Sequence, residues 1–477
     1  MLKVAGGIMA RPYRVLLVKP RHNDYTGHAL PPLGVMSLAA CVRRDDDVDV
    51  RIIDMTPWPM AYAELDHQMR RYAPDLVGIS AITFESKGLH RAARLVKRWR
   101  TDVPVIAGGP HATSYTEDVL QDANIDVAAI GEGEVTFAEL LDAFRRRAPL
   151  DGIAGIAYRR DGRVVVTPPR APIADLDALS MPAWDLVPLR RYKYFDRFSK
   201  LGTQDYAALF TSRGCPYRCV YCHQIFGKRF RARSAENVFE EIRTLYTRYR
   251  IREFEVIDDV FNLDKRRMAA ICDMIVRSGM KISLTFPNGV RGDLLDAELI
   301  RMLRSAGTRF MTFAVETASP RLQELIGKNI DLEKIRRNIE LALAEGIFCQ
   351  GFFMVGFPTE TLEELQATFD FAIQSDLHAA HFFVVNPFDG TPLAQWAAEV
   401  GKPVKRNFNQ SYLTRGFDNL TDIPQGQFNR MRSMALKRFW LDPRRIWRIV
   451  RDYPNKEKLP HFLPTLVKRL TIRAQGH

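Results

Sequence analysis

The 477-residue sequence has few cysteines, no long apolar run and no excess of acidic residues. With only six cysteines in a chain of this length, we do not expect a fold held together by disulfide bonds. No run of about 18 uncharged apolar residues occurs, which excludes a membrane-spanning helix. The N-terminus lacks the apolar run of a secretory signal, so we expect a cytoplasmic protein. With 46% hydrophobic and 26% charged residues, the composition predicts a folded protein of two or three domains.

Short runs rich in valine and isoleucine alternate with helix-like segments over the first third of the chain. The runs are Arg14–Pro20, Val48–Asp54, Leu76–Thr83, Pro104–Gly109 and Val127–Gly133. Strands that are apolar on both faces and alternate with helices are typical of a parallel sheet covered on both sides. Five such units predict an α/β, doubly wound, Rossmann-like domain over residues 12–147. Ligands bind at the carboxyl edge of such sheets.

Residues 148–202 interrupt this alternation and contain six prolines. We expect them to form a connector that packs along the surface and not a third core.

A second alternation covers residues 203–395. Its predicted strands are Tyr206–Gly214, Glu253–Asp259, Ile282–Gly289, Arg309–Glu316, Ile347–Gly356 and Ala380–Pro387. Six strand–helix units predict a (β/α)6 partial barrel, whose carboxyl face holds the chemistry. Polar residues end these strands, and some of them would serve only as turn formers: Arg213, Asp258, Asp259, Asn288, Glu316 and Asn386.

Three of the six cysteines, Cys215, Cys219 and Cys222, share one loop directly after the first strand of this barrel. Three thiolates on a short loop can hold one face of a cubane iron–sulfur cluster and leave one iron open to a ligand. A zinc site is the alternative and needs a fourth ligand; His223 is adjacent but too close in sequence to complete a tetrahedron easily. A cluster of buried free cysteines is disfavoured because the loop is polar and rich in arginine. The other three cysteines, Cys41, Cys272 and Cys349, are expected in the core.

The segment CPYRCVYC (215–222) resembles the signature of the radical S-adenosylmethionine superfamily, with Tyr221 at the usual aromatic position. Three further segments resemble motifs of that superfamily, in order and at strand ends: AVET (314–317), GFFMVGFPTET (351–361) and NPFDGTPL (386–393). The resemblance implies that Glu316 contacts the ribose of S-adenosylmethionine and that Gly356 lies near its adenine. It covers residues 205–395 and implies a [4Fe-4S] cluster as cofactor.

The first domain resembles that of the cobalamin-binding subfamily. PPLG (31–34), GISAIT (78–83), GGPHAT (108–113) and GEGE (131–134) resemble its loops, although the D-x-H-x-x-G motif that supplies a histidine to cobalt is absent. Cobalamin would then bind without that histidine. The residues that the resemblance assigns to cobalamin are Ser80, Gly108, Gly109, His111, Gly131 and Glu132. A Rossmann-like domain for another nucleotide is the alternative, and the absence of G-x-G-x-x-G argues against a dinucleotide. His111, equally, would be a structural loop histidine.

The resemblance implies a cobalamin-dependent enzyme that generates a 5′-deoxyadenosyl radical and C-methylates an unactivated carbon of a small or lipid-like metabolite. An oxidative cyclase or rearranging enzyme, similar to the magnesium-protoporphyrin monomethyl ester cyclase or to hopanoid-pathway enzymes, is the alternative. A methylthiotransferase is disfavoured because only Cys41 lies in the first domain. Arg291 would pair with the carboxylate of S-adenosylmethionine or, alternatively, with a nearby aspartate. Flavodoxin or ferredoxin is the expected electron donor.

Residues 396–477 are expected to form a basic, mainly helical region. They contain 17 Lys and Arg against 6 Asp and Glu, a net charge of 17 − 6 = +11. A helix through Phe439, Trp440, Ile446, Trp447 and Val450 would be amphipathic, with Pro443 starting a new segment. It would lie on the inner face of a membrane or, as we favour, pack its aromatic residues on the barrel opening. Nucleic acid is a disfavoured partner, because no RNA-binding module is visible.

Overall fold

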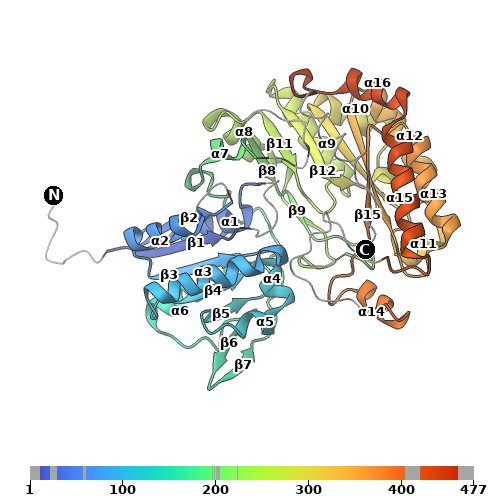
Figure 1. Cartoon of the computed structure of the whole chain (residues 1–477). Helices are drawn as coiled ribbons and strands as arrows, with labels where there is room; N and C mark the ends of the chain where they lie inside the picture. Colours follow the sequence, from blue (N-terminus) through green and yellow to red (C-terminus); the bar gives the residue numbers. More distant parts are fainter. Residues whose placement is uncertain are drawn as a thin grey trace. The chain divides into compact units, whose positions relative to one another are not determined.

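The computed structural model describes residues 11–21, 29–56, 61–195, 197, 199, 205–222, 224–402 and 419–459. These residues form two compact units, each built on its own sheet (Figure 1). The first unit extends to Pro188, apart from Ala29, Leu30 and Ala174–Asp177, which belong to the second. Within the described ranges, none of the helices has the length and apolar character needed to cross a bilayer.

The first unit contains a seven-stranded sheet in the order β2-β1-β3-β4-β5-β6-β7. Strands β1 to β5 are parallel, and the order 2-1-3-4-5 is that of a doubly wound flavodoxin-like sheet, which confirms the predicted fold class. The strands are β1 (Tyr13–Lys19), β2 (Val48–Asp54), β3 (Leu76–Ser80), β4 (Val105–Gly108), β5 (Val127–Ala129), β6 (Ile156–Arg160) and β7 (Arg163–Val166).

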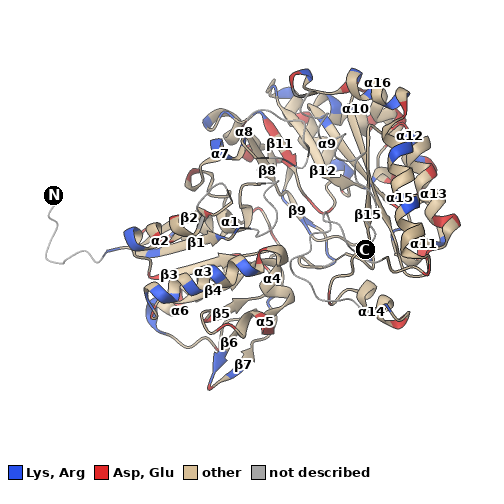
Figure 2. Ribbon diagram, viewed as in Figure 1, with Lys and Arg blue, Asp and Glu red and all other residues tan. Residues whose placement is uncertain are grey.

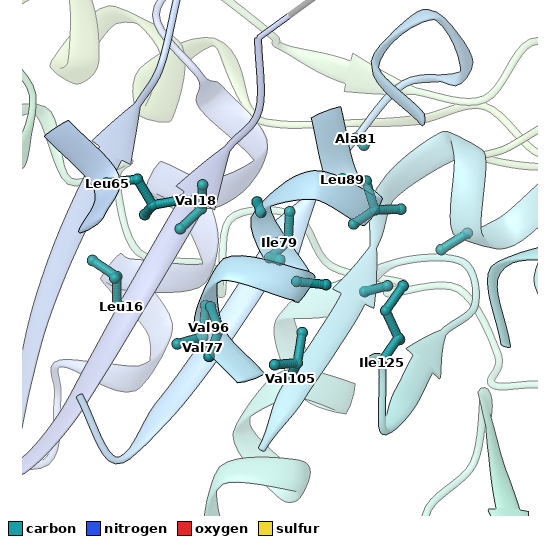
Figure 3. Close-up of a cluster of buried hydrophobic side chains, with 14 of the residues drawn as sticks. Leu16, Val18, Leu65, Val77, Ile79, Ala81, Leu89, Val96, Val105 and Ile125 are labelled. Carbon is teal, nitrogen blue, oxygen red and sulfur yellow. The ribbon is translucent and has the colours of Figure 1, made fainter. Parts of the chain in front are cut away.

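Helices cover both faces of this sheet. They are α1 (Leu33–Val42), α2 (Ala61–Tyr72), α3 (Ser86–Trp99), α4 (Gly109–Ser114), α5 (Thr116–Leu120) and α6 (Gly133–Arg146), with a 3-10 turn at Thr83–Glu85. Alternate side chains of the strands enter two separate cores, because successive residues of a strand point to opposite faces. Leu16 and Val18 of β1 pack in one core with α2 and α3, as Figure 3 shows for this cluster. Val15 and Leu17 pack in the other core with α1 and α6.

Residues 156–166, which the sequence analysis assigned to a connector, extend the first sheet. β6 pairs antiparallel with β5, and β7 pairs antiparallel with β6. Ile156 and Ala157 are fully buried by this pairing, whereas Val164 and Val166 stay exposed on the edge strand. The positive φ of Asp161 and Gly162 forms the tight turn between the two strands. The prediction of a surface connector starting at residue 148 was therefore wrong for this hairpin, because two four- to five-residue strands give too short a pattern to recognise.

The second unit contains a six-stranded parallel sheet in the order β15-β14-β13-β12-β11-β8. Among the described residues, the end strands β15 and β8 each pair with one neighbour and not with each other, so the sheet is a partial barrel, as predicted. The strands are β8 (Tyr206–Leu209), β11 (Glu253–Val256), β12 (Ser283–Val290), β13 (Thr308–Glu316), β14 (Phe348–Val355) and β15 (Ala379–Val384). The helices that connect them are α8 (Ala235–Arg248), α9 (Lys265–Arg277), α10 (Ala297–Ser305), α12 (Leu332–Ala344) and α13 (Leu362–Gln374).

Each of these five helices begins at a residue whose side chain caps it. The side-chain oxygens of the capping residues accept the backbone N–H three residues further on, at Ser234, Asp264, Asp296, Asp331 and Thr361. Such caps satisfy an N–H that has no partner within the helix. The short elements of this unit are α7 (Leu189–Tyr192), β9 (Ser212–Arg213), β10 (Arg231–Ala232), α11 (Pro320–Leu325) and α14 (Pro392–Glu399), with 3-10 turns at Gly292–Leu294 and Lys456–Lys458.

Two C-terminal helices, α15 (Gln425–Trp440) and α16 (Pro443–Asp452), complete the second unit. α15 covers the edge strand β15, where Nε of Arg432 donates to the carbonyl oxygen of Phe382 at 3.1 Å. Phe439 and Trp440 are fully buried on α15, and the expected packing of the tail's aromatic residues on the barrel opening stays a prediction. Pro443 does start a new helix, but Ile446, Trp447 and Val450 on α16 remain exposed. The aromatic residues of the tail therefore separate into a buried group and an exposed group.

Candidate functional site

The cysteine loop begins at Gly214, directly after the short strand β9. Gly214 has φ of +81°, and a Cβ atom there would lie 2.3 Å from the carbonyl oxygen of Arg229. Only glycine fits this position, because both the conformation and the space exclude a side chain. The loop is then held at both ends, where Cys215 N–H donates to the carbonyl of Gly227 and Val220 N–H to that of Ile326.

The thiols of Cys215, Cys219 and Cys222 lie on this one loop, and Cys272 and Cys349 are buried elsewhere, as predicted. Cys41 is half-buried. Surrounding protein atoms raise the pKa of the Cys222 thiol to about 11, although the residue as a whole is exposed, and the charges of Cys219 and Cys215 add to this shift. A bound metal would remove these protons, because the thiolate is the ligand.

Three thiolates on one short loop are the donor set of an iron–sulfur cluster with one open iron. Among the described residues, no three His, Cys, Asp or Glu side chains converge on one point as a mononuclear site requires. A cubane cluster has no such requirement, because each thiolate binds a different iron. His223, the fourth ligand considered for zinc, lies outside the described residues.

A buried carboxylate fixes the strand that leads into the loop. Asp258, at the carboxyl end of β11, accepts hydrogen bonds from the N–H and hydroxyl of Thr211, both at 2.6 Å, and from the hydroxyl of Ser212 at 2.5 Å. Burial raises the pKa of Asp258, while the nearby Arg267 lowers it. Asp258 is therefore placed to position the cysteine loop, and the neighbouring Asp259 accepts the N–H of Gly214.

A second loop, residues 326–329, holds the cysteine loop from the other side. Its backbone oxygens accept Val220 N–H and, at 3.7 Å, the thiol of Cys219. Gly327 has φ of +67°, and a Cβ there would lie 2.8 Å from the carbonyl oxygen of Arg218. The sequence analysis missed this loop, because only its glycine gives a local signal.

Glu316 ends β13 with φ of +67°, an uncommon conformation for a residue with a side chain. Its carboxylate forms an ion pair with Lys328 of the 326–329 loop at 3.2 Å, and both side chains are nearly buried. This conformation is observed at the residue for which the resemblance predicted a ribose contact. Strained residues of this kind cluster at functional sites. Lys328 is a further site residue that the sequence analysis missed.

Gly356 directly follows β14 with φ of +90°, and the ring of Phe428 on α15 would lie 3.2 Å from a Cβ there. Its N–H donates to the carboxylate of Glu360 at 2.5 Å, and Phe357 N–H donates to the same oxygen. Burial raises the pKa of Glu360 to about 8, although these two donors lower it. Glu360 therefore fixes the turn at this strand end, which sequence reasoning did not assign.

Tyr221 and Arg291 lie beside the same loops. The ring of Tyr221 packs against Phe357, with centroids 6.3 Å apart. Arg291 pairs with Asp293 at 2.8 Å, donates to the backbone oxygens of Lys328 and Asn329, and stacks over Tyr217. The structure thus confirms the alternative prediction for Arg291, a salt bridge with a nearby aspartate. Its contact with the carboxylate of S-adenosylmethionine stays a prediction.

In the first unit, the predicted ligand edge is the carboxyl edge of β3, β4 and β5. Gly109 starts α4 with φ of +84°, and a Cβ there would lie 2.7 Å from the hydroxyl oxygen of Ser80. Gly131 has φ of +82°, and a Cβ there would meet nothing within 4 Å. Gly108 is similarly open, with only Ala129 at 4.0 Å. This edge offers bare backbone and free space, which fits the close approach of a large planar cofactor.

Thr113 connects the two glycine loops of this edge. Its hydroxyl accepts the N–H of Gly131 and donates to the carbonyl of Gly109, both at 3.0 Å. Glu132, predicted as a cofactor contact, accepts the N–H of Ile173 at 2.9 Å. The sequence analysis did not single out Thr113, although it lies within the GGPHAT segment that it quoted.

His111 is buried on α4, 1% exposed, and its ring lies 5.2 Å from that of Tyr115. Burial lowers the pKa of His111 to about 4, so the ring is neutral at physiological pH. This environment is compatible with the structural role, and a contact with cobalamin stays a prediction.

Comparisons with known proteins agree with both halves of this arrangement. Residues 24–141 match the B12 binding domain family, and residues 209–372 match the Radical SAM superfamily. An uncharacterized methyltransferase of Pyrococcus horikoshii is 33% identical over 438 residues, which cover 90% of this chain and 93% of that protein. An anaerobic magnesium-protoporphyrin IX monomethyl ester cyclase of Rubrivivax gelatinosus is 28% identical, over 82% of this chain and 71% of its own length.

A solved structure shares the fold. The radical S-adenosylmethionine methyltransferase TsrM from Kitasatospora setae, solved with cobalamin and a [4Fe-4S] cluster bound, superposes with a TM-score of 0.66 at 21% identity. The match covers 82% of this chain and 75% of TsrM. Together with the relative from Pyrococcus horikoshii, these matches place the chain in a known family. The chain belongs to the radical S-adenosylmethionine enzymes that carry an N-terminal cobalamin-binding domain.

Proposed function

We propose that this enzyme C-methylates an unactivated carbon of a small or lipid-like metabolite. The observation that carries the proposal is the three-cysteine loop, which two fixed elements hold beside the carboxyl ends of β13 and β14. The relative from Pyrococcus horikoshii, which this chain matches over 93% of that protein's length, is named a methyltransferase. This name favours methyl transfer over other outcomes.

When bound, the cluster, S-adenosylmethionine and cobalamin would supply a carbon-centred radical and a methyl group. Cys215, Cys219 and Cys222 would hold the cluster as thiolates. Glu316 would accept hydrogen bonds from the ribose hydroxyls, because it ends β13 beside the cysteine loop and its carboxylate is held there by the ion pair with Lys328. Gly356 would lie near the adenine ring and contact it by packing alone, because its N–H already donates to Glu360 and its carbonyl oxygen accepts from Leu420.

The first unit would bind cobalamin at its glycine-lined edge. The open space at Gly131 and the close packing at Gly109 leave backbone, with few side chains, along this edge. Ser80, Gly108, His111 and Glu132 belong to the same edge and remain proposed contacts.

An oxidative cyclase or rearrangement enzyme is the second candidate. The cyclase of Rubrivivax gelatinosus is 28% identical to this chain, and the match covers 71% of the cyclase. The two outcomes differ in their products. Anaerobically reconstituted enzyme that releases S-adenosylhomocysteine together with 5′-deoxyadenosine would support methyl transfer. Release of 5′-deoxyadenosine without S-adenosylhomocysteine would contradict it and favour the second candidate.

The cysteine loop provides the matched variants for this experiment. Cys219→Ala should lose the cluster chromophore, the bound iron and S-adenosylmethionine cleavage. Cys41→Ser changes a thiol of the first unit and should keep all three. Activity in the Cys219→Ala variant would remove the proposed chemistry altogether.

The reaction also requires an external electron donor, for which we propose flavodoxin or ferredoxin. A nucleic acid is not proposed as a partner.

A further inference from the structure

Helix α16 has an inner face that fastens it to the barrel. The guanidinium of Arg445, 1% exposed, donates to the carbonyl oxygens of Leu377, Ile373 and Ser375, where α13 ends. Nε2 of His378 lies 3.1 Å from a carboxylate oxygen of Asp452 at the end of α16. These contacts fix the rotation of the helix about its own axis, and so determine which residues face outward.

The outer face of α16 carries an apolar stripe. Pro443, Ile446, Trp447 and Val450 follow the i, i+3, i+4, i+7 spacing of one helix face, and all four are exposed. Ile446 is 37% exposed, Trp447 66% and Val450 39%. Side chains at this spacing normally form the buried face of a helix, so this helix shows a second apolar face to its surroundings. We call these four residues the outer stripe.

Arginines line one side of the outer stripe. Arg444, Arg448 and Arg451 recur at i, i+4 and i+7, beside the side of the helix that carries Trp447. Residues 419–459 contain 10 Lys and Arg against 4 Asp and Glu, a net charge of 10 − 4 = +6. Figure 2 shows basic residues on α15 and α16. An apolar stripe bordered by arginines is the pattern of a helix that lies on a lipid surface.

The position of α16 in the barrel limits which partner it can serve. On its inner side, Asp452 contacts His378, which lies just before β15. Tyr453, which follows the helix, has its ring 5.8 Å from the ring of Phe348, the first residue of β14. The cysteine loop lies at the opposite, carboxyl ends of the strands. The eight residues of β14 span about 26 Å. An electron donor seated on α16 would therefore be far from the cluster, and a substrate bound there would not enter the site.

We infer that the outer stripe and its arginines bind the surface of a membrane that contains anionic lipids. The exposed tryptophan suits the interface, where its ring is apolar and its N–H stays hydrated. Arg448 pairs with Asp376 and Arg451 with Asp452, so these two arginines would exchange a carboxylate for a lipid phosphate, whereas Arg444 would bind one directly. Each arginine would strengthen binding about fivefold. Since α16 lies away from the cluster, this contact localises the enzyme and is independent of its cofactors.

The test is vesicle flotation of the full-length protein. It should float with vesicles of phosphatidylglycerol and phosphatidylcholine, remain unbound with phosphatidylcholine alone, and dissociate as salt is raised. Ile446→Ser/Trp447→Ser should lose most of this binding. Arg444→Gln/Arg451→Gln should weaken it by roughly 20-fold or more, at about fivefold for each arginine.

Two control variants remove the same numbers of exposed apolar and basic side chains at positions outside α16. Val164→Ser/Val166→Ser removes two exposed apolar side chains of β7, and Arg163→Gln/Arg266→Gln removes two exposed charges. Both should bind as the unaltered protein does. The inference is overturned if the full-length protein does not float, if it floats equally with both vesicles, or if the α16 variants bind like their controls. A concentration-dependent dimer in sedimentation equilibrium, lost in Ile446→Ser/Trp447→Ser without any vesicle binding, would instead assign the outer stripe to a second copy.

Discussion

The ammonium group of Lys328 lies 3.2 Å from Oε1 of Glu316, and each side chain is 10% exposed. The pair joins the end of β13 to the loop that also accepts hydrogen bonds from Val220 and Arg291. A buried pair of this kind matters most when one partner is removed, because the remaining charge then lacks both its partner and water. Lys328 is therefore a positioning residue for Glu316.

Replacing Lys328 by methionine should lower the free energy of unfolding by about 3 kcal/mol, since it leaves a buried carboxylate unpaired. Urea unfolding measures this loss. Lys265→Met breaks an exposed pair with Asp296 and should cost less than about 1 kcal/mol. Binding of S-adenosylmethionine by the reconstituted protein, measured by equilibrium dialysis, should also weaken in Lys328→Met and return in part in Lys328→Arg. Equal stability of Lys328→Met and Lys265→Met would show that the pair has no positioning role.

Gly214→Ala should prevent correct folding of the cysteine loop. The added Cβ would lie 2.3 Å from the carbonyl oxygen of Arg229, and the φ of +81° disfavours any side chain. Gly227→Ala is the matched control in the same loop, with φ of +73° and nothing within 4 Å of the Cβ. The control should lose about 1 kcal/mol from the backbone conformation alone and retain its cluster. Iron content after anaerobic reconstitution should be low in Gly214→Ala only, and similar iron in both variants would contradict the steric argument.

The sequence was sufficient to predict the cysteine loop, the five parallel strands of the first sheet and the six strands of the second, because these features are local; it missed the hairpin of β6 and β7. Strands that end in glycine or a polar residue repeat at regular spacing, and the three cysteines lie within eight residues. The carboxyl edge that gathers Cys215, Glu316 and Gly356 follows from parallel topology alone. The sequence could therefore predict which strand ends carry the site.

Contacts between distant segments could not be predicted in this way. Lys328 follows Glu316 by 12 residues, and only the path of α11 brings its ammonium back to that carboxylate. Arg445 and Arg444 are adjacent in sequence, yet one is buried and the other exposed, because the rotation of α16 is set by α13. Such assignments depend on packing between elements and leave no local pattern.

Stability should fall as the pH is lowered from about 6.5 to about 4, because of His378. Burial lowers the pKa of this ring to about 4 from an ordinary value of 6.5, so between these values the unfolded chain binds a proton that the folded chain does not. His378 alone accounts for a loss of about 1.4 kcal/mol per pH unit over this window, and His111, whose pKa is lowered to the same value, adds a similar loss that a His378 variant retains. His378→Asn should give a flatter acid limb in urea unfolding, whereas His67→Asn, at an exposed position on α2, should follow the unaltered profile. Parallel profiles for His378→Asn and the unaltered protein would show that the ring does not titrate as expected.

Arg445→Met should loosen α16 from the barrel, whereas Arg444→Met should not. Arg445 donates to three carbonyl oxygens at the end of α13 and stacks over Phe439 at 3.6 Å. Methionine fills part of the space but leaves these oxygens without donors, at a cost of about 3 kcal/mol. Arg444, the adjacent arginine, is exposed, and its replacement should change stability by no more than about 0.5 kcal/mol. Hydrogen exchange should report faster opening of α16 amides in Arg445→Met only. If exchange in α16 were equal in the two variants, the inner face described for this helix would be incorrect, and the exposure of Ile446 and Trp447 would lose its structural basis.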